Sequence, residues 1–158
     1  MGQITPFLWF DDKAEEAMNF YTSIFRNSKK GSVRHYGEAG PGRKGSVMTA
    51  SFTLNGQDFM ALNGGPRFKF TEAISFFVNC ETQEEVDELW EKLSAGGEKS
   101  QCGWLKDKFG LSWQIVPTVL VEMLGDKDAA KSQRVMKAML RMTKLDIAEL
   151  EKAYEGKA

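Results

Sequence analysis

The first 117 residues of the chain repeat one pattern of secondary structure. In each copy an apolar strand is followed by an amphipathic helix and then by short strands. The two helices align at an offset of about 69 positions, so that Phe20 and Tyr21 match Leu89 and Trp90. Because the copies share their order and spacing, the sequence predicts two βαβββ modules, at residues 4–66 and 73–117.

The elements of each module follow from local patterns. In the first module we expect a strand at residues 4–10, a helix whose N-terminus is capped at Asp11 or Asp12, and strands at residues 32–37, 46–55 and 57–63. Asn55-Gly56 is a strong hairpin signal between the last two. In the second module we expect a strand at residues 73–80, a helix capped by Thr82, and short strands at residues 100–104 and 111–116.

After Pro117 the pattern changes to helices alone. Helices are expected at residues 118–124 and 127–142, and a last one is capped by Asp146 with Glu149 three residues further on. This segment has no partner in the repeat. We therefore expect one domain at residues 1–117 and a C-terminal helical extension at residues 118–158, packed on that domain or on a dimer partner.

Charge and composition exclude several classes of function. The 21 Lys and Arg residues nearly balance the 22 Asp and Glu residues, so the net charge of -1 gives no field that would attract nucleic acid or anionic lipid. No apolar run is long enough to span a bilayer, and no signal peptide is recognised. The two cysteines, Cys80 and Cys102, form no CxxC motif. We expect a cytoplasmic protein with both thiols free, and neither nucleic acid nor membrane as a partner.

Three stretches carry a resemblance to a known family. They are ITPFLWFDDKAEEAMNFYTSIF at residues 4–25, ALNGGP at residues 61–66 and CGWLKDKFGLSWQIVP at residues 102–117. The chain resembles the PhnB-like group, labelled 3-demethylubiquinone-9 3-methyltransferase, of the vicinal oxygen chelate superfamily, which includes glyoxalase I, extradiol dioxygenases and bleomycin-resistance proteins. The resemblance implies an α+β, glyoxalase-like fold of duplicated βαβββ modules, and a homodimer. Whether the modules pair within one chain or by exchange between chains stays open.

The methyltransferase label does not agree with the glycine pattern. A typical site for S-adenosylmethionine needs a glycine-rich turn between a parallel strand and a helix, and no GxGxG follows a strand in this sequence. The glycine-rich segment Gly40–Gly45 falls between two strands that we expect to be antiparallel. We interpret it as a hairpin loop.

The resemblance also allows a test for a metal ion. Metal-dependent relatives hold the ion with one His, Gln or Glu from the first and last strand of each module. These positions fall on residues 4–6, Ala61, Ala73 and Gln114, of which only Gln114 is a donor. The single histidine, His35, lies on a strand that supplies no ligand in the superfamily. We expect neither a metal nor another cofactor.

A pocket is expected where side chains alternate towards the concave face of the strands. Small side chains and neutral hydrogen-bonding groups on that face would suit a small apolar or aromatic molecule. The candidate pocket residues are Leu8, Ala61, Asn63, Ala73, Ser75, Phe77, Ser112 and Gln114. The intervening residues Met60, Leu62, Ile74, Phe76, Val78, Trp113 and Ile115 are expected to face the helices.

Three functions remain open at this point. The first is a small-molecule-binding protein without a metal, which sequesters its ligand or transforms it by metal-free chemistry. The alternatives are a metal-dependent enzyme and a dimeric structural module with a vestigial pocket. No Ser-His-Asp or Cys-His set can be assembled, and acid–base chemistry would depend on Glu72, Lys106, Asp107 or Lys108, none of which the sequence marks as buried. The sequence therefore does not decide whether the protein is an enzyme.

Overall fold

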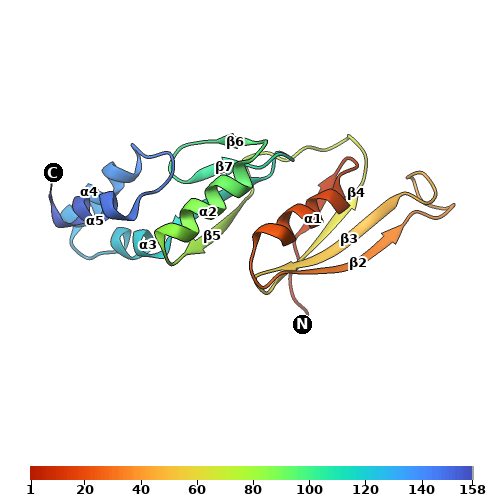
Figure 1. Cartoon of the computed structure of the whole chain (residues 1–158), viewed down its shortest axis with the longest axis horizontal. Helices are drawn as coiled ribbons and strands as arrows, with labels where there is room; N and C mark the ends of the chain where they lie inside the picture. The colour runs from red at the N-terminus through yellow and green to blue at the C-terminus, as the bar shows by residue number, and fades with distance from the viewer. Residues whose placement is uncertain (158) are drawn as a thin grey trace. The chain divides into compact units, whose positions relative to one another are not determined.

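The computed structural model describes residues 1–157 and divides into two compact units, Met1–Phe70 and Thr71 onward. The first unit contains β1 (Phe7–Phe10), α1 (Ala14–Ile24), β2 (Lys29–His35), β3 (Val47–Leu54) and β4 (Gln57–Asn63). The second contains β5 (Ser75–Cys80), α2 (Gln83–Ser94), β6 (Glu98–Lys99), β7 (Trp104–Lys106) and β8 (Ser112–Pro117). Three helices then follow: α3 (Thr118–Leu124), α4 (Ala129–Met139) and α5 (Ile147–Glu155) (Figure 1).

Each unit has the same sheet topology, which confirms the predicted duplication. The strand orders are β1-β4-β3-β2 and β5-β8-β7-β6. In both sheets the first and last strands of the module pair in parallel, and the other neighbours are antiparallel. The fold is α+β, with two modules of the glyoxalase type. The expectation that residues 1–117 form one domain stays a prediction.

One helix covers one face of each sheet. In the first unit Tyr21 of α1 lies against Phe52, and Phe52 stacks on Phe59 with ring centroids 5.5 Å apart. In the second unit Val86 and Trp90 of α2 are buried on the equivalent side. The apolar stripe of each helix therefore meets alternate residues of the strands beneath it, which is the main source of burial in each unit.

The N-terminus of α1 differs from the prediction. The N-cap residue is Lys13, whose side chain makes no capping hydrogen bond, so the expected cap at Asp11 or Asp12 is wrong. The amide of Ala14 instead donates to Asn63 Oδ1 over 2.8 Å. The cap is supplied by β4 from 49 residues away, and a local pattern cannot reveal such a partner.

Two helix caps agree with the prediction, whereas several helix and strand limits differ from it. Thr82 and Asp146 cap α2 and α5 as predicted, by accepting from the amides of Glu85 and Glu149. The strand expected at residues 100–104 is wrong, because residues 100–103 form a turn between β6 and β7. The first edge strand, β2, begins three residues earlier than expected, at Lys29.

A buried carboxylate organises the turn before β8. Asp107 is 2% exposed, and its Oδ1 accepts from the amides of Phe109 and Leu111 at 2.9 and 3.0 Å. Its Oδ2 accepts from the indole nitrogen of Trp113 at 2.9 Å. A buried charge is tolerated only with such partners. Sequence reasoning treated Asp107 as a candidate acid or base, but its oxygens are engaged in holding the turn.

The C-terminal extension packs on the second unit. A cluster of buried residues joins the end of β8 to the three helices: Val116, Leu120, Met123, Val135, Leu145 and Leu150. The backbone of residues 102 and 103 donates to the carbonyls of Met142 and Thr143, each at 2.8 Å. Gly103 has φ +84°, and a Cβ at this position would lie 2.8 Å from Leu145 Cδ1. Glycine is therefore needed where the extension meets the sheet.

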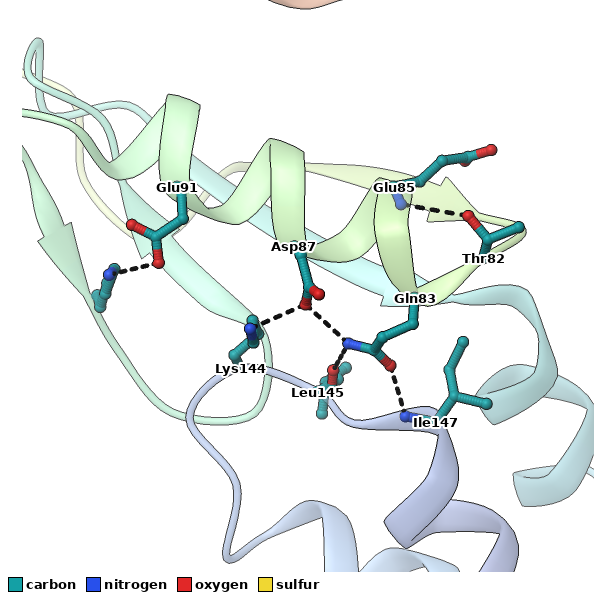
Figure 2. A network of polar contacts seen from close by, with 9 residues as sticks. Thr82, Gln83, Glu85, Asp87, Glu91, Lys144, Leu145 and Ile147 are labelled. Carbon is teal, nitrogen blue, oxygen red and sulfur yellow. Dashed lines mark hydrogen bonds and ion pairs between the residues drawn. The ribbon is translucent and has the colours of Figure 1, made fainter.

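A polar latch fixes the extension to the start of α2 (Figure 2). Gln83 Nε2 donates to the carbonyl of Leu145 and to Asp87, and Gln83 Oε1 accepts from the amide of Ile147 at 2.8 Å. Lys144 pairs with Asp87 at 2.8 Å. Hydrogen bonds from Lys144 and then Gln83 lower the pKa of Asp87 below 3.8. The stabilisation from this pair is present at neutral pH and is lost as the pH falls through that lowered value.

None of the helices in residues 1–157 is both long and apolar enough to cross a membrane.

Replacing Asp107 with Ala is expected to lower the free energy of unfolding by about 3 kcal/mol, because two amides and one indole N–H lose their buried acceptor. Asp107→Asn, which keeps one acceptor oxygen, should cost less. Urea denaturation measures both, with the exposed Asp58→Ala as a control. A loss no larger than that of the control would show that the carboxylate does not organise the turn.

Replacing Gln83 with Leu is expected to destabilise the protein by about 2 kcal/mol, since Ile147 N–H and Leu145 C=O lose their partner together. Hydrogen exchange at the amides of residues 147–150 should become faster, because the latch holds this part of the extension. Gln133→Leu, on the exposed side of α4, is the matched control. Unchanged exchange in Gln83→Leu would contradict a role in fixing the extension.

Candidate functional site

The second sheet leaves one face uncovered by α2, and we call it the open face. Alternation along β5 and β8 sends Phe76 and Trp113 towards α2, and their rings lie 5.4 Å apart. Four of the predicted pocket residues point the other way: Ser75, Phe77, Ser112 and Gln114. These four orientations agree with the predicted alternation, and that the residues form a ligand pocket stays a prediction.

Strand pairing arranges the open face in two rows. Trp104 of β7 lies opposite Gln114 of β8, which lies opposite Phe77 of β5. In the next row Lys106 lies opposite Ser112, which lies opposite Ser75. We call these the aromatic row and the hydroxyl row. Side chains of directly opposed residues are neighbours in a sheet, so each row forms a continuous strip.

The polar groups of the open face are only partly used by the protein itself. Gln114 Nε2 donates to Ser75 Oγ at 3.0 Å. Ser112 is 1% exposed, and its hydroxyl has no hydrogen-bond partner in the described part of the chain. A buried hydroxyl without a partner costs about 1–3 kcal/mol, so an occupant that supplies an acceptor would be favoured here.

A hollow of about 260 Å³ opens beside the hydroxyl row. Its lining comprises Glu72, Glu98, Lys99, Ser100, Trp104, Leu105, Lys106 and Ser112. Lys106 forms an ion pair with Glu72, and this hydrogen bond lowers the pKa of Glu72 and raises that of Lys106. The sequence named Glu72 and Lys106 as candidate acid–base groups, and the structure brings them together at this hollow.

The predicted pocket residues of the first module lie elsewhere. Leu8 and Ala61 are buried at 7% and 0% exposure, on the face that α1 covers, so their predicted orientation is wrong. The opposite face of this sheet instead carries the neighbouring residues Phe7, Trp9, Met60 and Leu62. The physical reason is that residues 4–10 are apolar at almost every position, so alternation cannot fix which side faces the helix.

Two further residues are displaced from the expected face. Ala73 precedes β5 and is exposed, and its amide donates to Thr71 Oγ1 at 3.3 Å. Ile74, expected in the core, is 70% exposed because it also precedes the strand. The strand begins at Ser75, two residues later than the sequence pattern indicated.

Asn63 serves the fold of the first unit through the ALNGGP stretch. Besides capping α1, its Nδ2 donates to the carbonyl of Val47 at 3.1 Å. The next residue, Gly64, runs so close to the indole of Trp9 that a Cβ would lie 2.4 Å from that ring. Trp9 Nε1 donates to the carbonyl of Gly65 at 2.9 Å. This family-like stretch ends β4 and seats Trp9, and none of its contacts requires a ligand.

The residues at the expected metal positions do not fit a divalent ion. Of the positions expected from the sequence, residues 4–6, Ala61 and Ala73 offer no ligand. The parallel register pairs Phe7 with Met60 and Phe77 with Gln114, so it moves the first module's counterpart of Gln114 from Ala61 to Met60. Neither phenylalanine has a donor atom, so these positions offer one donor in each unit, a thioether in the first and a neutral amide in the second, and each is a weak ligand for a hard or borderline ion. No group of three or more His, Cys, Asp or Glu residues that could hold a metal occurs in residues 1–157. His35 is exposed at the end of β2.

Both cysteines are free, as predicted. Cys80 is fully buried, and burial raises the pKa of its thiol to about 12. The thiol is therefore protonated at neutral pH and is not a nucleophile.

A second hollow, larger than the one beside the hydroxyl row, lies in the first unit and was not predicted. It measures about 500 Å³ and is bordered by the start of α1, the loop at residues 41–46 and the end of β4. Its floor is Tyr36, whose hydroxyl donates to the carbonyl of Asn63 at 2.5 Å. The acidic pairs Asp11-Asp12 and Glu15-Glu16, which line this hollow, were the feature of the sequence that could have indicated it. The buried polar groups here have protein partners, so Ser112 makes the smaller hollow the stronger candidate.

The glycine-rich loop is a hairpin connection. Gly40–Gly45 joins the antiparallel strands β2 and β3, as the sequence predicted. The connections from β1 to α1 and from β5 to α2, which carry no glycine, are the places where a nucleotide-type turn would be expected.

Comparison with known proteins agrees with this architecture. The family model described as 3-demethylubiquinone-9 3-methyltransferase matches residues 2–116. A PhnB protein from Bacillus cereus, carrying the same methyltransferase label, is 46% identical, with a TM-score of 0.68 over 74% of this chain and 100% of that chain. No curated protein sequence matches.

Two more distant structures share the fold alone. Protein PA1353 from Pseudomonas aeruginosa is 21% identical, with a TM-score of 0.62 over 74% of this chain and 98% of its own. The fosfomycin resistance protein FosX from Listeria monocytogenes is 19% identical, with a TM-score of 0.54 over 77% and 97%. On its family match over residues 2–116 and its likeness to the PhnB protein, the chain belongs to the 3-demethylubiquinone-9 3-methyltransferase (PhnB-like) family.

Proposed function

We propose that this protein binds a small molecule on the open face of its second sheet, without a metal ion. The observation that carries the proposal is the buried hydroxyl of Ser112, which has no hydrogen-bond partner within residues 1–157 and belongs to a residue that lines a hollow. Polar groups in protein interiors are nearly always paired, so an unpaired one at a hollow suggests an occupant.

The chemistry of the aromatic row supports an aromatic ligand. Trp104 is partly buried, and Phe77, on the edge strand β5, is 47% exposed. Gln114 between them donates to Ser75 through Nε2, which leaves its amide oxygen available to a ligand. Flat apolar surfaces with a few convergent neutral groups are typical of small-molecule sites.

Methyl transfer receives no support from the chain's own residues. The two strand-to-helix turns lack the glycines that let a backbone approach a nucleotide, and Gly40–Gly45 lies in a hairpin. We propose ligand sequestration, or metal-free transformation of the ligand, as the activity of this family member.

Titration with 2-naphthamide, an uncharged aromatic probe, is expected to shift the indole N–H resonance of Trp104. A dissociation constant of about 1 mM is reasonable for a compound of this size. Ser112→Ala should weaken binding about threefold or more but leave stability unchanged or raised, because it removes an unpaired buried hydroxyl. Ser132→Ala on α4 is the control. An unshifted Trp104 resonance would refute the proposed site.

A thermal-shift series with metal ions distinguishes the proposed function from the metal-dependent alternative. Nickel, zinc, manganese and cobalt ions should not raise the thermal midpoint of the purified protein, since only binding to the native state would do so. Stabilisation by any of them, lost in Gln114→Ala, would favour a metal centre instead.

We also propose that the protein is a homodimer. The face of the first sheet opposite α1 exposes Phe7 at 54%, next to Met60 and Leu62, and an apolar sheet face of this kind is suited to an isologous contact.

Light scattering at micromolar concentration should give twice the chain mass of 17.8 kDa. Phe7→Lys is expected to shift this mass towards the monomer, because it places a charge in the contact. Val121→Lys, at a similarly exposed position on α3, should not. A monomeric wild-type protein would overturn the dimer.

A further inference from the structure

The hydroxyl row ends at Lys106, whose ammonium group is paired with the exposed carboxylate of Glu72. Lys106 projects from β7 on the open face, whereas Lys99 of β6 pairs with Glu91 of α2 over 2.9 Å. Lys106 is thus the one lysine or arginine that the described strands of the second sheet present on this face. Its partner Glu72 lies before β5, among exposed residues 71–74 that belong to no strand.

Glu72 can leave Lys106 without disturbing the sheet. The side chains of Lys106 and Glu72 are 39% and 59% exposed, and ion pairs of this exposure contribute little to stability. Lys106 itself is fixed by strand pairing on both sides, opposite Glu98 and Ser112. The arrangement is a lysine whose backbone is held by strand pairing on both sides, paired with an exposed carboxylate from a segment outside the sheet.

The Glu72 carboxylate leaves the adjacent donor unused. Ser112 lies directly opposite Lys106 on the neighbouring strand, yet its hydroxyl donates neither to Glu72 nor to any other described group. A ligand carboxylate that lies closer to the strands than that of Glu72 could accept hydrogen bonds from Lys106 and Ser112 together. Charge-assisted hydrogen bonds are stronger than neutral ones, so such an anion has an advantage over Glu72.

Glu98 restricts the charge of that anion. It lies opposite Lys106 on β6, so its carboxylate faces the same hollow. With Glu72 displaced, Lys106 and Glu98 together carry no net charge. Lys99, the other cation lining the hollow, is already paired with Glu91, so a second negative group on the ligand would be repelled by Glu98. The site therefore suits a monoanion better than a dianion.

We infer that the ligand of the proposed site is an aromatic monocarboxylate, whose carboxylate replaces Glu72 on Lys106 and Ser112 while its ring lies along Trp104 and Phe77. This inference rests on the proposed function. The two rows are two residues apart along β8, or about 7 Å, which is comparable to the separation between a carboxylate and the far ring of a bicyclic arene.

The test compares 2-naphthoate with 2-naphthamide, which share the ring system and differ in the charged group. Wild-type protein is expected to bind the carboxylate about tenfold more tightly, as followed by the Trp104 indole resonance. Lys106→Met should reduce that preference to within about twofold. Glu72→Gln should raise naphthoate affinity about threefold and leave naphthamide affinity unchanged, since a competing carboxylate is removed.

The controls are Lys92→Met and Glu88→Gln, which remove a similar ion pair of 2.6 Å on α2, away from the open face. Neither should change the preference. Equal binding of the two probes by the wild type would overturn the carboxylate inference and leave the proposed function standing. Failure of both probes to bind would overturn both. Should Lys106→Met not fold, an unchanged naphthoate affinity in Glu72→Gln would be enough to reject the inference.

Discussion

The parallel pairing of β5 with β8 is the constraint on which the candidate site depends. It brings the beginning and the end of the second module side by side, with β5 at the edge of the sheet and β8 next to it, so that Ser75 lies beside Ser112 and Phe77 beside Gln114. Because a single helix covers only one face, alternate residues of these two strands must point away from it. The same pairing in β1 and β4 gives the first module a comparable face, but there it is filled by Phe7, Trp9, Met60 and Leu62. Duplication has thus produced one apolar face and one face with polar groups.

The stretches that identify the family are mostly devices for folding. ALNGGP ends β4, caps α1 through Asn63 and makes room for Trp9. In CGWLKDKFGLSWQIVP, Gly103 leaves space for the side chain of Leu145, and Asp107 accepts hydrogen bonds from two amides and an indole N–H. A family match built on these positions is evidence for architecture, whereas the groups that would select a ligand lie at Ser75, Ser112, Gln114 and Lys106. Likeness to PhnB proteins therefore establishes the fold with more force than any activity.

The sequence predicted the fold well, since the repeat, the hairpin at Asn55-Gly56 and the caps at Thr82 and Asp146 are all local signals. It also predicted the orientation of Ser75, Phe77, Ser112 and Gln114, because polar and apolar residues alternate in β8. It could not do so for Leu8 and Ala61, where apolar residues occupy both faces and only the packing of α1 decides. Contacts over long separations were out of reach as well: the capping of Ala14 by Asn63, the burial of Asp107 by its turn, and the pairing of Lys106 with Glu72.

The helical extension changes what counts as the end of this protein's second unit. The family match stops at residue 116, yet Val116 shares its buried cluster with Leu120, Leu145 and Leu150. A gene fragment cut at the family boundary would divide that cluster. It would also lack Leu145, which packs against Gly103. The border drawn by sequence similarity and the border of cooperative folding therefore fall about 40 residues apart, which matters when this chain is trimmed, fused to another protein or dissected by proteolysis.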